Sequence, residues 1–128
     1  MLKNSFFSLR PAEKTDAAAT DPVLKFILTL NSEHPIYKGH FPGNPVVPGV
    51  CQIRMIHELL EEQLQVPLRL TAADQIKFLR MIDPGKDPEL EVDLRIRRTE
   101  TLEVDVNATI MAGPVFFLKF KGHFSPTP

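Results

Sequence analysis

The chain has 128 residues, of which 43% are hydrophobic and 24% are charged, so it is long enough for one domain with its own core. Its formal net charge of −1 gives no indication of binding to nucleic acid or to an anionic membrane surface. The single cysteine, Cys51, excludes an internal disulfide, and no spacing of cysteine or histidine suggests a metal or a cofactor. Because neither a membrane-spanning apolar run nor a signal-like N-terminus is visible, we expect a cytoplasmic protein.

The N-terminal part predicts two strands and a long connection. Residues 4–9 form a short apolar piece that predicts an edge strand, and residues 11–22 are polar and rich in alanine, which favours a loop. Residues 23–30 are short and rich in β-forming side chains, which predicts a strand. The connection from residue 31 to residue 47 is longer than most connections in a compact domain, and this length is typical of a functional segment.

Residues 39–50, with the sequence GHFPGNPVVPGV, are the most informative stretch of the chain. Three prolines and three glycines in twelve residues exclude a helix or a strand interior, because proline lacks a backbone donor and glycine loses much backbone entropy on folding. The stretch carries His40 and leads directly into the start of a helix. A stiff loop with a histidine in this position predicts a functional site.

The run from residue 51 to residue 65 contains neither glycine nor proline and predicts one long helix. Apolar side chains recur at helical spacing on one face, at Val50, Ile53, Ile56, Leu60 and Leu64. A second, smaller apolar patch and a polar stripe complete the helix, the patch with Met55 and Leu59 and the stripe with Arg54, His57, Glu58 and Glu61. A helix that is apolar on two sides is expected to be mostly enclosed.

The C-terminal part changes to a period of two, which is typical of strands with one buried face in an antiparallel sheet. Strands are expected at residues 75–82, 91–97, 102–110 and 115–124, with turns at 83–85, 98–100 and 113–114. This order predicts a single α+β domain over residues 1–128, in which a curled antiparallel sheet surrounds one helix. The outer face of such a sheet needs a partner or polar side chains, which favours a homodimer.

The loop and this architecture together resemble the hotdog-fold 3-hydroxyacyl-[acyl-carrier-protein] dehydratases. The matching residues are His40-Phe41-Pro42-Gly43, then Pro45, and then Pro48-Gly49-Val50 at the start of the helix. A second, supporting match runs from Lys77-Phe78-Leu79-Arg80 to Asp83-Pro84-Gly85. The resemblance implies a hotdog fold that acts as a homodimer or an oligomer of dimers. It also implies a thioester substrate, carried by acyl carrier protein or CoA, in fatty-acid or related polyene or polyketide synthesis.

The resemblance also implies roles for individual residues. His40 would remove the proton beside the thioester carbonyl, because a neutral imidazole exchanges protons near neutral pH. The amide of Gly49 at the helix N-terminus would stabilise the enolate-like oxygen. Phe41, Pro48 and Val50 would contribute to substrate binding. The product of the elimination would be a trans-2-enoyl thioester.

One position departs from the family pattern. The family places a Glu or Asp fourteen residues after the histidine, to protonate the leaving hydroxyl, and here that position is Arg54. A guanidinium is a poor proton donor, and loss of a general acid lowers the rate by about a hundred- to ten-thousand-fold. Glu58 lies one helical turn, about 5 Å, further on and is the candidate for a displaced acid. Arg54 is interpreted either as an ion-paired helix residue or as a contact to an anionic group of the substrate.

Three functions therefore remain open at this point. The first is a dehydratase, in which His40 itself or a bound water returns the proton to the leaving hydroxyl. The second is a binding module that holds an acyl thioester without eliminating water. The third is a thioesterase on the same fold. His34 and His57 are interpreted as structural, His123 is expected to lack a partner, and Cys51 is expected to be a packing residue.

Overall fold

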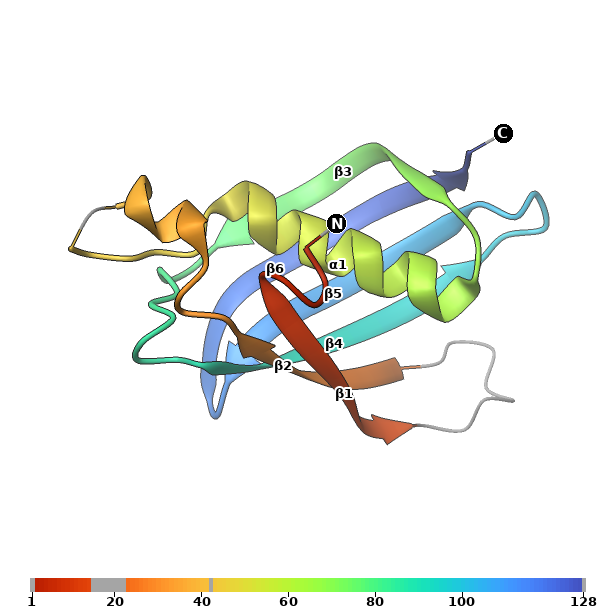
Figure 1. Cartoon of the computed structure of the whole chain (residues 1–128). Helices are drawn as coiled ribbons and strands as arrows, with labels where there is room; N and C mark the ends of the chain where they lie inside the picture. Colours follow the sequence, from red (N-terminus) through yellow and green to blue (C-terminus); the bar gives the residue numbers. More distant parts are fainter. Residues whose placement is uncertain (1, 15–22, 42, 128) are drawn as a thin grey trace.

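A six-stranded antiparallel sheet curls around one long helix in the computed structural model, which describes residues 2–14, 23–41 and 43–127 (Figure 1). The sheet has the strand order β1-β2-β4-β5-β6-β3. The elements in chain order are β1 (Phe7–Lys14), β2 (Val23–Leu30), the 3-10 helix η1 (Pro35–Lys38), α1 (Gly49–Leu64), β3 (Leu68–Phe78), β4 (Glu89–Arg98), β5 (Val104–Ala112) and β6 (Val115–Pro126). This is the predicted hotdog architecture, and the predicted order of strands around one helix is confirmed.

The most deeply buried side chains of α1 come from both of the predicted apolar groups. The wholly buried side chains of the helix are Met55, Ile56, Leu59 and Leu60. Burial of each of these side chains contributes roughly 1.5–3 kcal/mol, so together they determine which face of the helix is turned towards the core. Val50, which was placed on the larger apolar face, is 76% exposed. The two apolar stripes overlap on the helix, and helical spacing alone does not distinguish which of them contacts the sheet.

Two strand boundaries also differ from the prediction. Strand β1 continues to Lys14, so residues 11–14, which were expected in a loop, belong to the sheet, whereas residues 15–22 lie outside the described residues. Pro11 is accommodated because β1 is an edge strand and its register shifts between Pro11 and Glu13. Strand β3 covers Leu68–Phe78 instead of residues 75–82. The predicted strand at residues 23–30 and the turn at residues 113–114 are confirmed.

Strand β3 is an exposed edge of the sheet. It pairs with β6 on one side, and every residue from Arg69 to Phe78 is exposed. Large apolar side chains on this strand and just after it are exposed, namely Leu70, Ile76, Phe78, Leu79 and Met81. A long exposed edge strand is a template for pairing with another chain. Neither helix of the described part of the chain is long and apolar enough to cross a membrane.

Candidate active site

The connection between β2 and α1 is held in place by backbone hydrogen bonds. The N–H of Ile36 donates to Nδ1 of His34 at 3.1 Å, which caps the short helix η1. The N–H of His40 donates to the carbonyl oxygen of Ile36 at 3.2 Å. Further on, the N–H of Val47 donates to the carbonyl oxygen of Ile82 at 2.9 Å, which ties the loop to the segment after β3. His40 therefore lies in a loop that is fixed at both ends.

A cavity of about 590 Å³ lies between this loop, the first turn of α1 and the end of β3. His40, Phe41, Gly49 and Gln52 line it from the loop and the helix, and residues 78–81 line it from the other side. Most of the lining is apolar. A cavity of this size with few polar groups is typical of a site for a small apolar ligand such as an acyl chain.

The imidazole of His40 lies in this cavity and is positioned by an aromatic neighbour. Its ring stacks on Phe41 with a centroid distance of 4.3 Å and an interplanar angle of 23°. Nδ1 of His40 is buried and has no hydrogen-bond partner within the described residues. The ring is therefore positioned by packing on Phe41, and its Nδ1 is not occupied by another group of the described structure.

The first turn of α1 has free backbone donors, and one of its residues, Gly49, lines the same cavity. Pro48 is the N-cap residue and makes no side-chain capping bond, and the first amides with helical partners are those of Cys51 and Gln52, which donate to the Pro48 carbonyl. The amides of Gly49 and Val50 thus have no acceptor in the described part of the chain. Uncapped N–H groups at the positive end of a helix stabilise a developing negative charge.

Glycine at position 49 also permits a close approach of a neighbouring ring. A Cβ atom added at Gly49 would lie 2.7 Å from Cζ of Phe78. Phe78 is 52% exposed, so its ring can move aside, but in this structure it covers the start of the helix. The ring of Phe78 and the amide of Gly49 therefore share one wall of the cavity.

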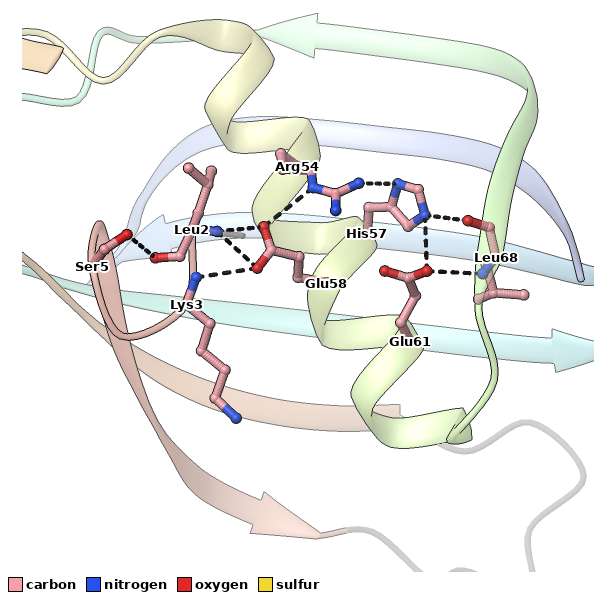
Figure 2. Close-up of polar contacts among 8 residues, drawn as sticks. All are labelled: Leu2, Lys3, Ser5, Arg54, His57, Glu58, Glu61 and Leu68. Atoms are coloured by element: carbon pink, nitrogen blue, oxygen red, sulfur yellow. Dashed lines mark hydrogen bonds and ion pairs between the residues drawn. The ribbon is translucent and has the colours of Figure 1, made fainter. Parts of the chain in front are cut away.

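Arg54 and Glu58 form an ion pair that also anchors the N-terminus (Figure 2). The Nε–H of Arg54 donates to Glu58 at 3.2 Å. The backbone N–H of Leu2 donates to both carboxylate oxygens, at 3.0 and 2.9 Å, and that of Lys3 donates at 3.1 Å. The side chain of Glu58 is 2% exposed, whereas that of Arg54 is 42% exposed. The Glu58 carboxylate is therefore occupied by three donors, and it does not line the cavity that contains His40.

His57 continues this polar chain along the helix (Figure 2). Its Nε2 lies 2.7 Å from the Leu68 carbonyl oxygen, and its Nδ1 lies 3.3 Å from Nη1 of Arg54. The carbonyl can only accept, so Nε2 carries the proton and Nδ1 accepts from the guanidinium. Glu61 accepts from the N–H of Leu68 at 2.9 Å. These contacts join α1 to the start of β3, which is a structural role for His57.

Several predicted site residues lie elsewhere. Val50 points its side chain into solvent, and Pro48 is buried, and neither lines the cavity. Gln52, which the sequence reasoning did not single out, lines the cavity and is 3% exposed. A signal for it was present, because Gln52 lies three, four and seven residues before Met55, Ile56 and Leu59 and so shares their buried stripe.

His123 has two carboxylate partners, so the expectation that it lacks a partner was wrong. Its Nδ1 lies 2.5 Å from Asp105 on β5, and its Nε2 lies 2.8 Å from Asp74 on β3. Hydrogen bonds to Asp105 and Asp74 raise the pKa of His123 above its ordinary value. The cluster links the edge strand β3 to β6 and β5, and it lines a different surface depression from the one that contains His40.

Cys51 is a buried free thiol in the first turn of α1. Burial raises the pKa of this thiol, which keeps it protonated near neutral pH. The predicted role of Cys51 as a packing residue agrees with its position in the core. Residues 2–14, 23–41 and 43–127 contain no group of three or more His, Cys, Asp or Glu side chains arranged to hold a metal ion.

Curated proteins with similar sequences include 3-hydroxyacyl-[acyl-carrier-protein] dehydratases. The chain is 32% identical to the 3-hydroxyacyl-[acyl-carrier-protein] dehydratase FabZ of Alkaliphilus metalliredigens over 79 residues, which cover 56% of this chain and 54% of that protein. It is 34% identical to FabZ of Levilactobacillus brevis over 90 residues, covering 65% of this chain and 60% of that protein. The match thus spans little more than half the length of these curated relatives.

Solved structures share the fold at lower sequence identity. The dehydratase heterocomplex ApeI:P from Xenorhabdus doucetiae contains a chain that matches with a TM-score of 0.62 and 18% identity, covering 91% of this chain and 97% of that one. A putative thioesterase from Shewanella oneidensis matches with a TM-score of 0.53 and 14% identity, covering 94% and 83%. The family model described as ApeI-like, ApeI dehydratase, matches residues 14–113. Since this match covers most of the chain, the protein belongs to the ApeI-like dehydratase family of hotdog-fold proteins.

Proposed function

We propose that the chain is a hydro-lyase that removes water from a 3-hydroxyacyl thioester. His40 takes the proton from C2, and the amide of Gly49 stabilises the negative charge on the thioester oxygen. The C3–O bond then breaks, the hydroxyl takes up a proton and leaves as water, and a trans-2-enoyl thioester remains. The observation that carries this proposal is the single cavity that joins His40 to the uncapped start of α1.

The acid that protonates the leaving hydroxyl is proposed to come from a partner subunit. Arg54 occupies the family's acid position, and Glu58 is occupied by backbone donors. The cavity is bordered by the end of the exposed edge strand β3, where another hotdog chain can extend the sheet. The relative from Xenorhabdus doucetiae is a heterocomplex, which supports a different chain as the partner. A second copy of this chain is the alternative, and it would again bring Arg54 instead of a carboxylic acid.

The test is turnover of 3-hydroxyacyl thioesters by the purified protein, alone and with candidate hotdog partners encoded beside it. Acyl-carrier-protein and CoA thioesters of several chain lengths are compared, and the conjugated enoyl thioester is followed by its absorbance. We expect turnover that His40→Ala abolishes. A wild type that shows no more product than His40→Ala with any substrate or partner contradicts the proposal. Release of free thiol instead of enoyl product identifies a thioesterase.

A binding module is the second candidate, and the Arg54–Glu58 ion pair favours it. If the chain has no general acid, the cavity binds an acyl thioester but no water is eliminated from it. In that case Arg54→Glu creates dehydration activity in the chain alone, whereas Arg54→Gln does not. If a partner supplies the acid, the two variants have the same activity in the complex.

A further inference from the structure

Gln52 is a buried polar side chain with one atom that has no hydrogen-bond partner among the described residues. Among the residues whose burial the structure describes, the buried polar or charged ones are Gln52, Glu58 and Ser125. The hydroxyl of Ser125 donates to Glu103 at 3.1 Å, and Glu58 accepts from three donors. Gln52 makes one long bond, from its Nε2 to the Val47 carbonyl oxygen at 3.3 Å. Its Oε1 is buried and has no partner in the described part of the chain.

The single bond of Gln52 fixes which end of the amide is free. The Val47 carbonyl can only accept a hydrogen bond, so the nitrogen of the amide must face it. The opposite orientation would set two acceptor oxygens against each other. Oε1 of Gln52 is therefore the atom that lacks a hydrogen-bond donor, and a buried acceptor without a donor is unfavourable.

Gln52 lines the same cavity as His40 and Gly49. It lies three residues after Gly49, which is about 4.5 Å along the helix axis and on the same side of the helix. In a 3-hydroxyacyl thioester a single methylene separates the carbonyl carbon from the carbon that bears the hydroxyl. When the substrate carbonyl oxygen lies at the Gly49 amide, its 3-hydroxyl is within reach of the next turn of the helix, which carries Gln52.

We infer that Gln52 is a specificity-determining residue whose Oε1 accepts a hydrogen bond from the 3-hydroxyl of the bound substrate. The inference rests on the proposed function for the identity of the substrate. The 3-hydroxyl is the donor closest to the reacting carbons, and both the saturated acyl thioester and the enoyl product lack it. A cavity with this acceptor selects the hydroxyacyl thioester and releases the enoyl product, because a site built to pair with a hydroxyl disfavours a ligand without one.

The experiment compares two ligands of equal chain length, a 3-hydroxyacyl and a saturated acyl pantetheine thioester, by calorimetry. The protein is the full chain with His40→Ala, which prevents turnover, with and without Gln52→Met. Methionine has a similar length and cannot accept a comparable hydrogen bond. The control variant is Gln63→Met, which is the same change on the same helix and away from the cavity.

We expect Gln52→Met to weaken binding of the hydroxyacyl thioester by about tenfold, the effect of one hydrogen bond, and to leave the saturated thioester within about twofold. Thermal unfolding should show Gln52→Met to be as stable as the wild type or more stable, because an unpaired buried acceptor has been removed. Equal weakening for both ligands, or no weakening for either, overturns the inference.

The outcomes separate this inference from the proposed function. If binding to the His40→Ala protein discriminates between the two ligands through Gln52 but the wild-type protein shows no turnover, the inference is supported and the dehydratase proposal is contradicted. A protein that turns over substrate while Gln52→Met affects both ligands alike supports the dehydratase proposal and overturns the inference. A protein that binds neither ligand overturns both.

Discussion

Replacing Glu58 tests whether its carboxylate anchors the N-terminus or serves as an acid. In Glu58→Gln the shape is kept, but the charge is lost and an NH₂ group faces donors in place of an acceptor oxygen. The amides of Leu2 and Lys3, which donate at 2.9–3.1 Å, then lose partners in a partly buried position. Each lost bond to a charged group is worth about 1.5–3 kcal/mol, at the lower end where water can enter.

Arg54 adds little to this sum. Its side chain is 42% exposed, so water replaces the carboxylate, and an exposed ion pair contributes about 0–1 kcal/mol. We therefore expect Glu58→Gln to lower the free energy of unfolding by about 2–4 kcal/mol, measured by urea denaturation. Phe6 and Phe7, which follow the anchored residues, are in the core, so hydrogen exchange of the N-terminal segment should increase as well.

The matched control is Glu62→Gln on the next turn of α1. Glu62 pairs with the Nζ of Lys3, and both side chains are partly exposed, so the expected loss is below about 1 kcal/mol. Turnover per folded molecule should stay the same in Glu58→Gln. If Glu58→Gln keeps its stability within about 0.5 kcal/mol and loses turnover, Glu58 is an acid and the anchoring role is refuted.

Three further outcomes are expected. Arg54→Gln should change stability by less than about 1 kcal/mol, since its ion pair is half-exposed, and a larger loss in denaturation experiments would contradict this. Gly49→Ala should lower turnover more than stability, because its Cβ would displace the ring of Phe78 from the cavity wall; unchanged steady-state kinetics would argue against this geometry. The raised pKa of His123 implies stabilisation that is fully present below the unfolded value of 6.5 and is lost as pH rises through the folded value. The difference in unfolding free energy between wild type and His123→Gln should therefore shrink from pH 6 to pH 9. A constant difference would show that the charged form of His123 contributes no stabilisation.

The features that sequence periodicity predicted are the local ones. Alternation identified the strands around Val92 and Val106, and the prolines and glycines of residues 39–50 identified the loop that carries His40. Both signals arise from neighbouring residues along the chain. Strand β3 was misplaced because it is exposed along almost its whole length, and a strand without a buried face shows no alternation.

The features that sequence reasoning missed depend on distant contacts. The buried carboxylate of Glu58 binds the backbone of Leu2, which lies 56 residues away in the chain. The spacing of residues on the helix gave no sign of this distant contact. The two partners of His123 are brought together only by the register of three strands. The face of α1 that contacts the sheet was also not determined by spacing, because two apolar stripes were available. Gln52 was placed on neither.

The most direct test of the central claim separates the base from the acid. A 3-hydroxyacyl thioester is incubated with the protein in D₂O, and incorporation of deuterium at C2 is followed by NMR. If His40 removes the C2 proton beside the helix N-terminus, the wild-type chain exchanges this position even when no partner supplies an acid, and His40→Ala does not. Exchange at the same rate in wild type and His40→Ala contradicts the claim that this imidazole is the base.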